Sequence, residues 1–402
     1  MFILYGEKYM LQKRINVGLV ISLAGFAISV NTLPPLIEWF SGHLCMPISS
    51  FGLVYFFQYG AFTLCSIGIG KLHAKRGLPL LSIAIGALFF SALCVFLIGR
   101  ATSFILLITL MMLIGGAGGL VESIGTTLLT VEDGSNRMLH ASQLFYAIGA
   151  VAAPAMVGFL LASGVHVPKI SQYIGIFSLL IAIVVFGLTR SSNSKTLKET
   201  PTPSHRPATA PLFALYVLFI TMGAYVIVEM SLGNWLAVFA IQTFSVTEAQ
   251  GSLALSLFWT GLCLSRLFYV LKSVKSQQKT LSIHMALMLL SCLILIASTK
   301  FGTLTLLYPT VILFGIGCGP IWPLLIEFCS AAFREEHLVM YLVASGSIGA
   351  LLGPILTSTL FGFFSIRNIP VILSAYTVLM MGSGVLTFRI LRNARRTRRS
   401  AA

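Results

Sequence analysis

Long apolar runs separated by short polar segments constrain this chain more than any other feature of its sequence. A helix needs about 20 predominantly apolar residues to cross the hydrocarbon core of a bilayer, and about twelve runs meet this criterion. An even number places both ends of the chain on one side of the membrane. The predicted spans are residues 16–39, 51–72, 78–99, 104–130, 139–163, 170–189, 212–242, 251–271, 281–299, 303–329, 339–364 and 369–391.

The composition also indicates an integral membrane protein. The chain is 57% hydrophobic and 9% charged, with a mean hydropathy of +0.95, and a water-soluble domain of this kind would expose large apolar patches. Lys8, Lys13 and Arg14 precede the first apolar run, as in a secretory signal peptide, but the run is too long and lacks a small-residue cleavage site. We therefore interpret it as an uncleaved first span.

The formal net charge of +15 is explained by membrane topology rather than by nucleic-acid binding. The basic residues are scattered through segments too short to fold as a nucleic-acid-binding module. With the N-terminus placed inside, every Lys and Arg except Arg100, Lys169, Lys300 and Arg367 falls inside or at an inner helix end. Both termini are therefore predicted to be cytoplasmic. Residues 392–402 form a basic tail, interpreted as a topology anchor at anionic headgroups.

An internal repeat predicts two pseudo-symmetric halves. The segment "IGAVAAP" at residues 148–154 reappears as "IGALLGP" at 348–354, and "GGAGG" at 115–119 overlies "GIGCG" at 315–319 in the same register. A Ser-, Thr- and Pro-rich segment lies between the sixth and seventh spans. We predict an N-terminal six-helix bundle at 1–189, a cytoplasmic linker at 190–211 and a C-terminal six-helix bundle at 212–391. Pro154 and Pro354 are expected to form soft points in spans five and eleven.

Three of the 11 acidic residues fall inside predicted spans. An ionised carboxylate at the centre of a span costs about 2.5–3.5 kcal/mol on insertion scales, so such a group faces water, has a partner or is protonated. Glu122 in span four and Glu229 in span seven are at depths suited to a central cavity, and we assign them to proton coupling. The alternative is that each acid only fixes helix packing. Glu327 is at a depth similar to that of Arg266, which predicts a gating or structural ion pair.

Amide, hydroxyl and aromatic groups at central levels of several spans suit a sugar-like ligand, although aromatic residues also fill cores. The predicted substrate-binding residues are Asn31, Gln58, Tyr59, Gln143, Tyr146, Asn234, Trp235, Trp259 and Trp322.

No metal or cofactor site is expected from the sequence. The seven Cys lie mostly within apolar runs and lack metal-ligand spacing, so they are interpreted as packing residues. His140 and His284 are interpreted as hydrogen-bonded structural residues near inner helix ends.

Segments of spans four, five, seven and ten resemble the fucose:proton symporter family of the major facilitator superfamily, which also contains bacterial glucose/galactose permeases. The resemblance lies in "LVESIGTTLLTVEDGSNRMLHASQLFYAIGAVAAP", "YVIVEMSLGNWL" and "GIGCGPIWP". Glu122, Arg137 and Gln143 match three positions of the first pattern, and Glu229 matches the glutamate of the second. The resemblance implies the major facilitator fold, a coupling role for Glu122 and a gating or structural role for Arg137. The acid that the family carries in span one is replaced here by Asn31.

These features predict a secondary active transporter that imports a sugar or similar small polar solute together with protons. An efflux antiporter is the alternative, because the Gly/Pro pattern of span five partly resembles an antiporter signature. A non-transporting sensor or polytopic enzyme is the third hypothesis, although no catalytic cluster or soluble domain is recognisable. We expect no catalytic residue, no cofactor, a small-molecule substrate, protons and the bilayer as partners, a monomer, and a bacterial inner membrane as the location.

Overall fold

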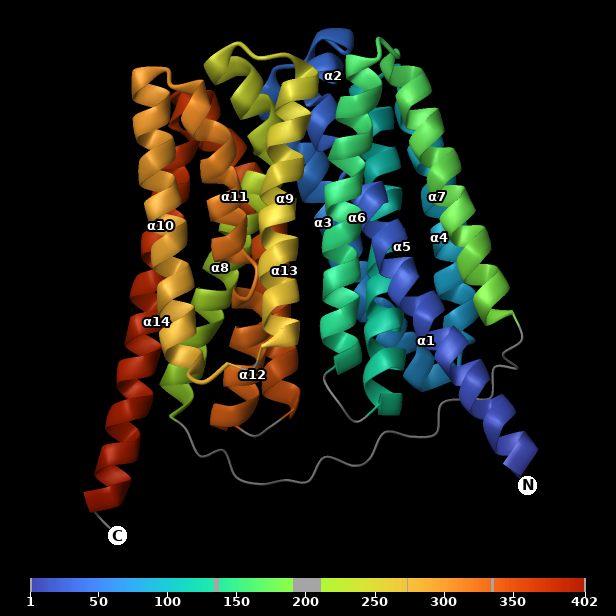
Figure 1. Ribbon diagram of the computed structural model, residues 1–402, viewed down its shortest axis with the longest axis vertical. Coiled ribbons are helices and arrows are strands. Elements are labelled where there is room, and N and C mark those ends of the chain that lie inside the picture. Colours follow the sequence, from blue (N-terminus) through green and yellow to red (C-terminus); the bar gives the residue numbers. More distant parts are fainter. Residues whose placement is uncertain (1, 134–136, 191–210, 273, 334–335, 401–402) are drawn as a thin grey trace. The chain divides into compact units, whose positions relative to one another are not determined.

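The structure, a computed structural model, describes residues 2–133, 137–190, 211–272, 274–333 and 336–400 (Figure 1). Within these ranges the side chains of 2–12, 74, 130–133, 137–140, 336–337, 340 and 394–400 are not described. The predicted linker at 190–211 therefore lies almost entirely outside the described residues, and so does the side chain of Arg137.

The described ranges form an all-helical membrane protein, and twelve of their segments are long and apolar enough to cross a bilayer, as the sequence predicts. Short 3₁₀ helices lie at Pro34–Leu36, Ile48–Ser50, Leu304–Leu306 and Ile366–Asn368. The α-helices are α1 (Phe2–Val30), α2 (Ile37–His43), α3 (Phe51–Arg76), α4 (Leu80–Ile98), α5 (Phe104–Asp133), α6 (Arg137–Ala162), α7 (Val167–Thr189), α8 (Leu212–Phe244), α9 (Glu248–Leu271), α10 (Gln277–Phe301), α11 (Leu307–Cys318), α12 (Ile321–Phe333), α13 (Glu336–Phe363) and α14 (Ile369–Ser400).

Two of the predicted spans are interrupted, and the last helix extends past its predicted span. The first span is divided between α1 and α2, and the tenth between α11 and α12 (Figure 1). Two prolines accompany each interruption and cannot donate a backbone hydrogen bond: Pro34 and Pro35 lie between α1 and α2, and Pro320 precedes α12 while Pro323 lies in its first turn. The basic tail predicted at 392–402 continues α14 as far as Ser400.

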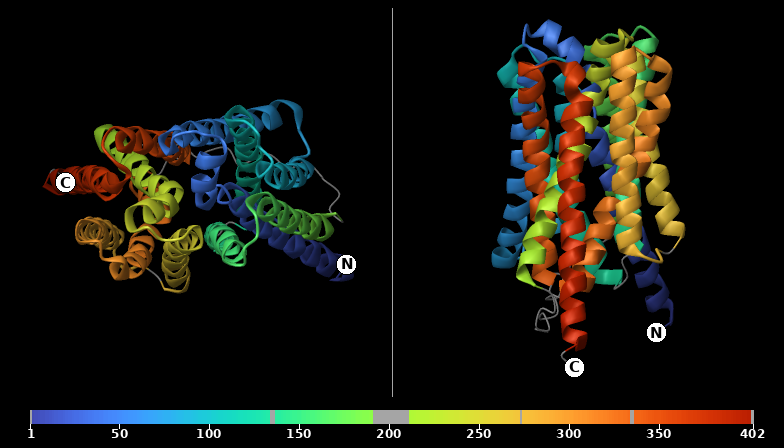
Figure 2. Two further views of the ribbon diagram at one scale, coloured as in Figure 1. Left: turned by 90° about the horizontal axis from the view of Figure 1, so that it is seen from above. Right: turned by 90° about the vertical axis from the view of Figure 1, so that its left-hand side faces the viewer.

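The chain folds into two compact units. Unit 1 comprises Met1–Thr200 and Thr247–Ser256, and unit 2 comprises Pro201–Val246 and Leu257–Ala402. The predicted bundles differ from these units because residues 247–256, the start of α9, group with unit 1. Within unit 1, α1 packs against α6 and α7; within unit 2, α8 packs in the same way against α13 and α14. Figure 2 shows these helices end-on.

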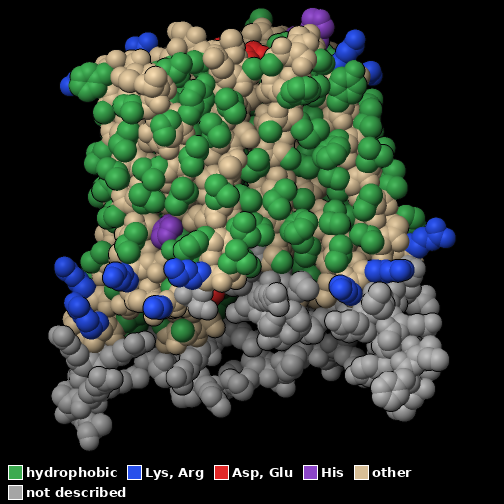
Figure 3. Space-filling view, in the orientation of Figure 1, with side chains coloured by type: hydrophobic (Ala, Val, Ile, Leu, Met, Phe, Trp, Pro, Cys, Tyr) green, Lys and Arg blue, Asp and Glu red, His purple; other side chains and the backbone are tan. Residues whose placement is uncertain are grey.

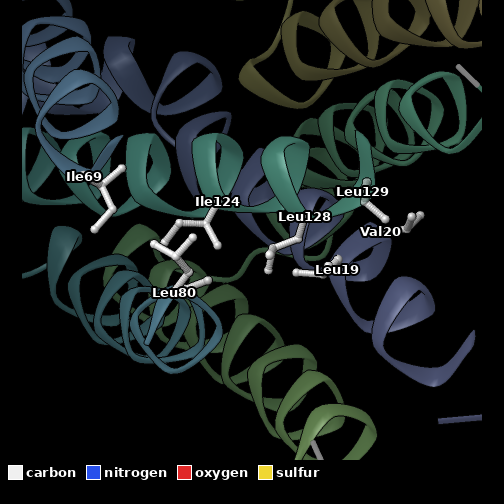
Figure 4. Close-up of a cluster of buried hydrophobic side chains, with 8 residues drawn as sticks. Leu19, Val20, Ile69, Leu80, Ile124, Leu128 and Leu129 are labelled. Carbon is white, nitrogen blue, oxygen red and sulfur yellow. The ribbon is translucent and has the colours of Figure 1, made fainter. Parts of the chain in front are cut away.

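Each unit carries a wide apolar surface, and on the visible face of each unit Lys and Arg side chains gather along its lower border (Figure 3). Large exposed residues such as Leu64, Ile105 and Phe159 on this surface suit contact with lipid. Inside unit 1, side chains from α1, α3, α4 and α5 form a dry cluster (Figure 4). Its members are Leu19, Val20, Ile69, Leu80, Ala84, Ile124, Leu128 and Leu129.

The 200-residue repeat of the sequence is also a repeat of backbone contacts. A Cβ atom on Gly115 would lie 2.0 Å from the carbonyl oxygen of Gln58, and one on Gly315 would lie 2.0 Å from that of Phe258. Both the glycines and the carbonyls are 200 positions apart, and each contact joins corresponding helices, α5 to α3 and α11 to α9. Only glycine permits such an approach. The repeated glycines therefore set the same helix spacing in each unit.

The glycines before Pro154 and Pro354 also repeat their contacts. A Cβ atom on Gly149 of α6 would lie 2.2 Å from the carbonyl oxygen of Ala24, and one on Gly349 of α13 would lie 2.5 Å from that of Gly223. Both prolines lie inside uninterrupted helices. The close approach joins the fifth span of each unit to the first.

Candidate functional site

The interruption of span ten leaves backbone carbonyl groups that need other donors. In an α-helix the carbonyl of residue i accepts from the N–H of residue i+4. Pro320 therefore leaves the carbonyl of Ile316 without its usual donor, and Pro323 does the same for Gly319. An unsatisfied carbonyl inside a membrane span is costly, so its partners must come from neighbouring helices.

Two side chains from other helices supply those hydrogen bonds. The Nδ1 of His284, on α10, lies 2.9 Å from the carbonyl oxygen of Ile316. The Nε of Arg266, on α9, donates to the carbonyl oxygen of Gly319 at 3.1 Å. Both side chains are buried, with 7% of their surface exposed. Arg266 thus places a positive charge at the C-terminal end of α11, where the helix dipole favours a cation.

His284 has a defined tautomer in this arrangement. A carbonyl oxygen only accepts hydrogen bonds, so Nδ1 carries the proton that is given to Ile316. The Nε2 atom then accepts from the hydroxyl of Tyr269, which lies 2.8 Å away. The imidazole is therefore held between the hydroxyl of Tyr269 on α9 and the carbonyl of Ile316 on α11.

A third donor reaches the interruption from α8. The hydroxyl of Tyr225 donates to the carbonyl oxygen of Cys318 at 3.1 Å. One turn further along α8, Oε1 of Glu229 lies 3.6 Å from Nη2 of Arg266. Glu229 is 4% exposed. A buried acid, a buried base and a tyrosine therefore meet at the point where span ten is broken.

Glu229 is a partner of Arg266 that the sequence did not predict. Its Oε1 lies 3.6 Å from Nη2 of Arg266, whereas the ion pair predicted for Arg266 is with Glu327. The Nε2 of Gln277 donates to Oε2 of Glu327 at 3.2 Å. An interaction of Arg266 with Glu327 stays a prediction.

Glu122 in unit 1 follows, by one turn of α5, a glycine that packs against a group of aromatic rings. It is half-buried on α5, one turn after Gly118, and a Cβ atom on Gly118 would overlap the ring of Phe26. The ring of Phe26 stacks on Phe62 at a centroid distance of 5.8 Å and lies 5.7 Å from the ring of Tyr146. These rings come from α1, α3 and α6.

The other polar candidates of unit 1 have varied surroundings. Asn31 is buried at the end of α1, and its Nδ2 donates to the carbonyl oxygen of Ala27 at 2.8 Å. Gln58 is fully buried, and among the described residues its side-chain amide finds no hydrogen-bonding partner. Tyr59, Gln143 and Tyr146 are half-buried.

The candidates of unit 2 are mostly packed between helices. Trp235 is fully buried and donates from Nε1 to the carbonyl oxygen of Pro354 at 3.0 Å, which favours a packing role. Asn234 donates to the carbonyl oxygen of Met230, and Trp259 packs against Gly233. Only Trp322, at the start of α12, is half-buried. Contact of these residues with a substrate stays a prediction.

Sequence reasoning missed the roles of Tyr225 and Tyr269, and it gave His284 no named partner. The signal was present in the prolines of "GPIWP", because each proline predicts which carbonyl needs another donor. What the sequence did not give was the identity of the donors. Among the described residues, no group of three or more His, Cys, Asp or Glu side chains could hold a metal ion.

A helical membrane fold with repeated halves, an interrupted span and buried charges is typical of secondary transporters. The sequence profile of the Major Facilitator Superfamily matches residues 17–342, and the chain belongs to this superfamily of membrane transporters. Among curated proteins it is 23% identical over 262 residues to the "Protein TsgA homolog" of Yersinia enterocolitica, covering 62% of this chain and 65% of that protein. The corresponding protein of Yersinia pestis is 22% identical over 255 residues, covering 61% and 63%. The chain therefore matches slightly less than two thirds of these relatives' length.

Solved structures share the fold at low sequence identity. The human organic anion transporter MFSD10 (TETRAN) matches with a TM-score of 0.64 and 14% identity, covering 94% of this chain and 99% of that one. A bacterial homologue of the human lysosomal transporter Spinster, in an inward-facing and occupied conformation, matches with a TM-score of 0.65 and 16% identity, covering 94% of both chains. With twelve candidate membrane spans in its described residues, this member of the superfamily is a multi-pass membrane transporter.

Proposed function

We propose that this transporter imports a sugar or similar small polar solute together with protons, by alternating access. The observation that carries the proposal is the presence of carboxylates within the spans of both units. Glu122 is half-buried in unit 1, one turn after a glycine that packs against aromatic rings, and Glu229 is buried against Arg266 at the interrupted span of unit 2. Ionisable groups inside membrane spans are expensive to maintain and mark ion or substrate pathways.

A sugar-like solute is supported by the chemistry around Glu122. Gln143 and Tyr146 are half-buried on one face of α6, and Tyr146 touches the aromatic group that packs against the glycine one turn before Glu122. Amide and hydroxyl groups next to an aromatic ring suit a ligand with hydroxyl groups and an apolar face. The resemblance of spans four and five to the fucose:proton symporter family points to the same class of solute.

The interrupted span favours protons over a metal cation as the coupling ion. In transporters with broken helices, freed carbonyls often coordinate Na⁺. Here the carbonyls of Ile316, Cys318 and Gly319 already interact with His284, Tyr225 and Arg266. The chain's own donors occupy the place where a cation would bind, and the nearby Glu229 is a group that can carry a proton.

The orientation follows from the basic residues. In unit 1, Lys71, Lys75 and Arg76 lie at the end of α3, and in unit 2, Arg389 and Arg392 lie at the end of α14. By the positive-inside rule, these ends face the cytoplasm. We therefore propose a bacterial inner-membrane protein with both termini in the cytoplasm, acting as a monomer.

Uptake into proteoliposomes tests the function. Purified protein is reconstituted and supplied with radiolabelled fucose, glucose or galactose under an inward proton gradient, and separately under an inward sodium gradient. We expect accumulation of at least one sugar driven by the proton gradient alone, and its loss in Glu122→Gln. Glu248→Gln, at the end of a span and also half-buried, is the matched control and should accumulate normally. Unchanged accumulation in Glu122→Gln would exclude this residue from coupling, and net export would indicate efflux.

A further inference from the structure

Gln58 on α3 carries a buried amide that the surrounding helices do not satisfy. Its side chain is 0% exposed, and in the part of the chain that the structure describes neither Oε1 nor Nε2 has a hydrogen-bonding partner. A buried polar group without a partner costs free energy, and the hydrocarbon around a membrane span offers no replacement. An amide that is kept at such a position needs a physical reason.

Unit 2 shows that the fold itself does not require this amide. The backbone carbonyl of Gln58 lies against Gly115, and the carbonyl of Phe258 lies against Gly315 in the same way. Phe258 is also fully buried, and its ring packs on Phe314 at a centroid distance of 6.3 Å. Helix spacing uses only the carbonyl, so an apolar side chain serves that purpose in unit 2. The amide of Gln58 is therefore an addition specific to unit 1.

Gln58 lies one helical turn before the aromatic group of unit 1. Phe62 is four residues further along α3, so the two side chains share one face of the helix. The ring of Phe62 stacks on Phe26, which lies 5.7 Å from the ring of Tyr146. The close contact at Gly115 holds the backbone of Gln58 against α5. A rigidly held amide one turn from aromatic rings is suited to orienting a ligand that has hydroxyl groups and an apolar face.

We propose that Gln58 is a specificity-determining residue, whose buried amide binds hydroxyl groups of the transported sugar. A carboxamide donates from Nε2 and accepts at Oε1, and neighbouring sugar hydroxyls can together satisfy both atoms. An analogue that lacks one of these hydroxyls leaves the amide unpaired again, so the site rejects it. The inference rests on the proposed function, because it names the chemical group of the solute that unit 1 recognises.

The proposal makes the amide a cost in the protein without solute. Gln58→Met introduces an apolar chain of similar length, so the variant should unfold in mixed micelles at the same SDS fraction as the parent or at a higher one. An amide that is satisfied inside the protein, for example by an internal water, predicts a lower SDS fraction.

Gln172→Met is the matched control for the loss of an amide. With its amide oriented to satisfy both residues, Oε1 of Gln172 accepts from Nε and Nη2 of Arg100 at 3.0 and 2.7 Å. The same substitution there removes an amide that has a partner, so the variant should unfold at a lower SDS fraction than the parent. Gln172 and Arg100 are at the outer ends of α7 and α4, and this variant should bind sugar like the parent.

Equilibrium binding measures recognition directly. Purified full-length protein in detergent is titrated with radiolabelled fucose, glucose and galactose, and then with monodeoxy analogues of any sugar that binds, without an ion gradient. In the parent, at least one monodeoxy analogue should bind at least about tenfold more weakly than its sugar. Gln58→Met should bind the sugar at least about tenfold more weakly than the parent does, and it should no longer distinguish the sugar from that analogue.

Three results would overturn the proposal. The first is that both Gln58→Met and a second variant, Gln58→Leu, are less stable than the parent; a variant that is as stable as the parent is the one used for binding. The second is that this variant binds the sugar, or discriminates against the analogue, as the parent does. The third is that the parent binds none of the three sugars.

The binding assay separates this inference from the proposed transport mechanism. Sugar binding that depends on Gln58, without proton-driven uptake, would refute the proposed coupling and support the inference. Proton-driven uptake with unchanged binding in the Gln58 variant would support the coupling and overturn the inference.

Discussion

The buried pair of Glu229 and Arg266 predicts a specific pattern of stability changes. Arg266→Met removes the positive charge, leaves Glu229 buried opposite an apolar side chain, and removes the Nε donor to Gly319. Breaking one partner of a buried ion pair costs about 3–5 kcal/mol, whereas replacing both partners by neutral groups can be close to neutral. The loss of a donor to a buried carbonyl adds about 1–3 kcal/mol.

A double-mutant cycle isolates the part that belongs to the pair. We expect Arg266→Met and Glu229→Gln each to lower the free energy of unfolding by at least about 3 kcal/mol. The double variant removes both charges of the pair. The free energy of unfolding that it loses should therefore be smaller than the sum of the two single losses, by at least about 2 kcal/mol. Unfolding is measured in mixed micelles by raising the SDS fraction and following tryptophan fluorescence.

An additive cycle would refute the reasoning. The two side chains do not interact energetically in the folded protein if the free energy of unfolding lost by the double variant equals the sum of the two single losses within about 0.5 kcal/mol.

Two further predictions concern helix packing. Gly149→Val should lower stability by about 1–3 kcal/mol and reduce the yield of monodisperse protein in size-exclusion chromatography, because the new side chain would meet the carbonyl oxygen of Ala24. Gly86→Val, which has open space around its Cβ position, is the control and should behave like the parent; equal yields of the two variants would contradict the packing argument. Trp235→Phe keeps the ring but removes the hydrogen bond to Pro354, so thermal unfolding in detergent should show a loss of about 0.5–1.5 kcal/mol. A stability equal to that of the parent would show that this hydrogen bond adds nothing.

The twelve spans were predictable because hydrocarbon thickness sets a minimum length for every apolar run. The interruptions inside spans one and ten were not predicted, because a run stays apolar when prolines divide it. The repeat was recognised from glycines and prolines, and the contacts of Gly115 and Gly315 give its physical reason: each lies against a backbone carbonyl.

The candidate site was only partly predictable. The position of a residue along its helix can be counted from the sequence. This count correctly placed Glu229 and Arg266 within spans. The direction in which a side chain points around its helix axis depends on how the helices pack, which the sequence does not show. The packing of α8 and α9 is what brings Arg266 to Glu229. Tyr225 is one turn before Glu229, so its presence on the same face could have been deduced from helical spacing.

The 200-residue register also shows how far the two units have diverged. Gln58 and Phe258 support equivalent glycine contacts, yet one has an amide and the other an aromatic ring. Arg266 has Ser66 as its counterpart in the same register. A chimera built from two copies of unit 1 would therefore retain the carbonyl–glycine contacts that space its helices. Its second copy of span four would be a continuous helix, because Leu120 and Ser123 stand where span ten has Pro320 and Pro323. The duplicated scaffold would therefore keep its helix spacing without the break that Arg266 and His284 serve.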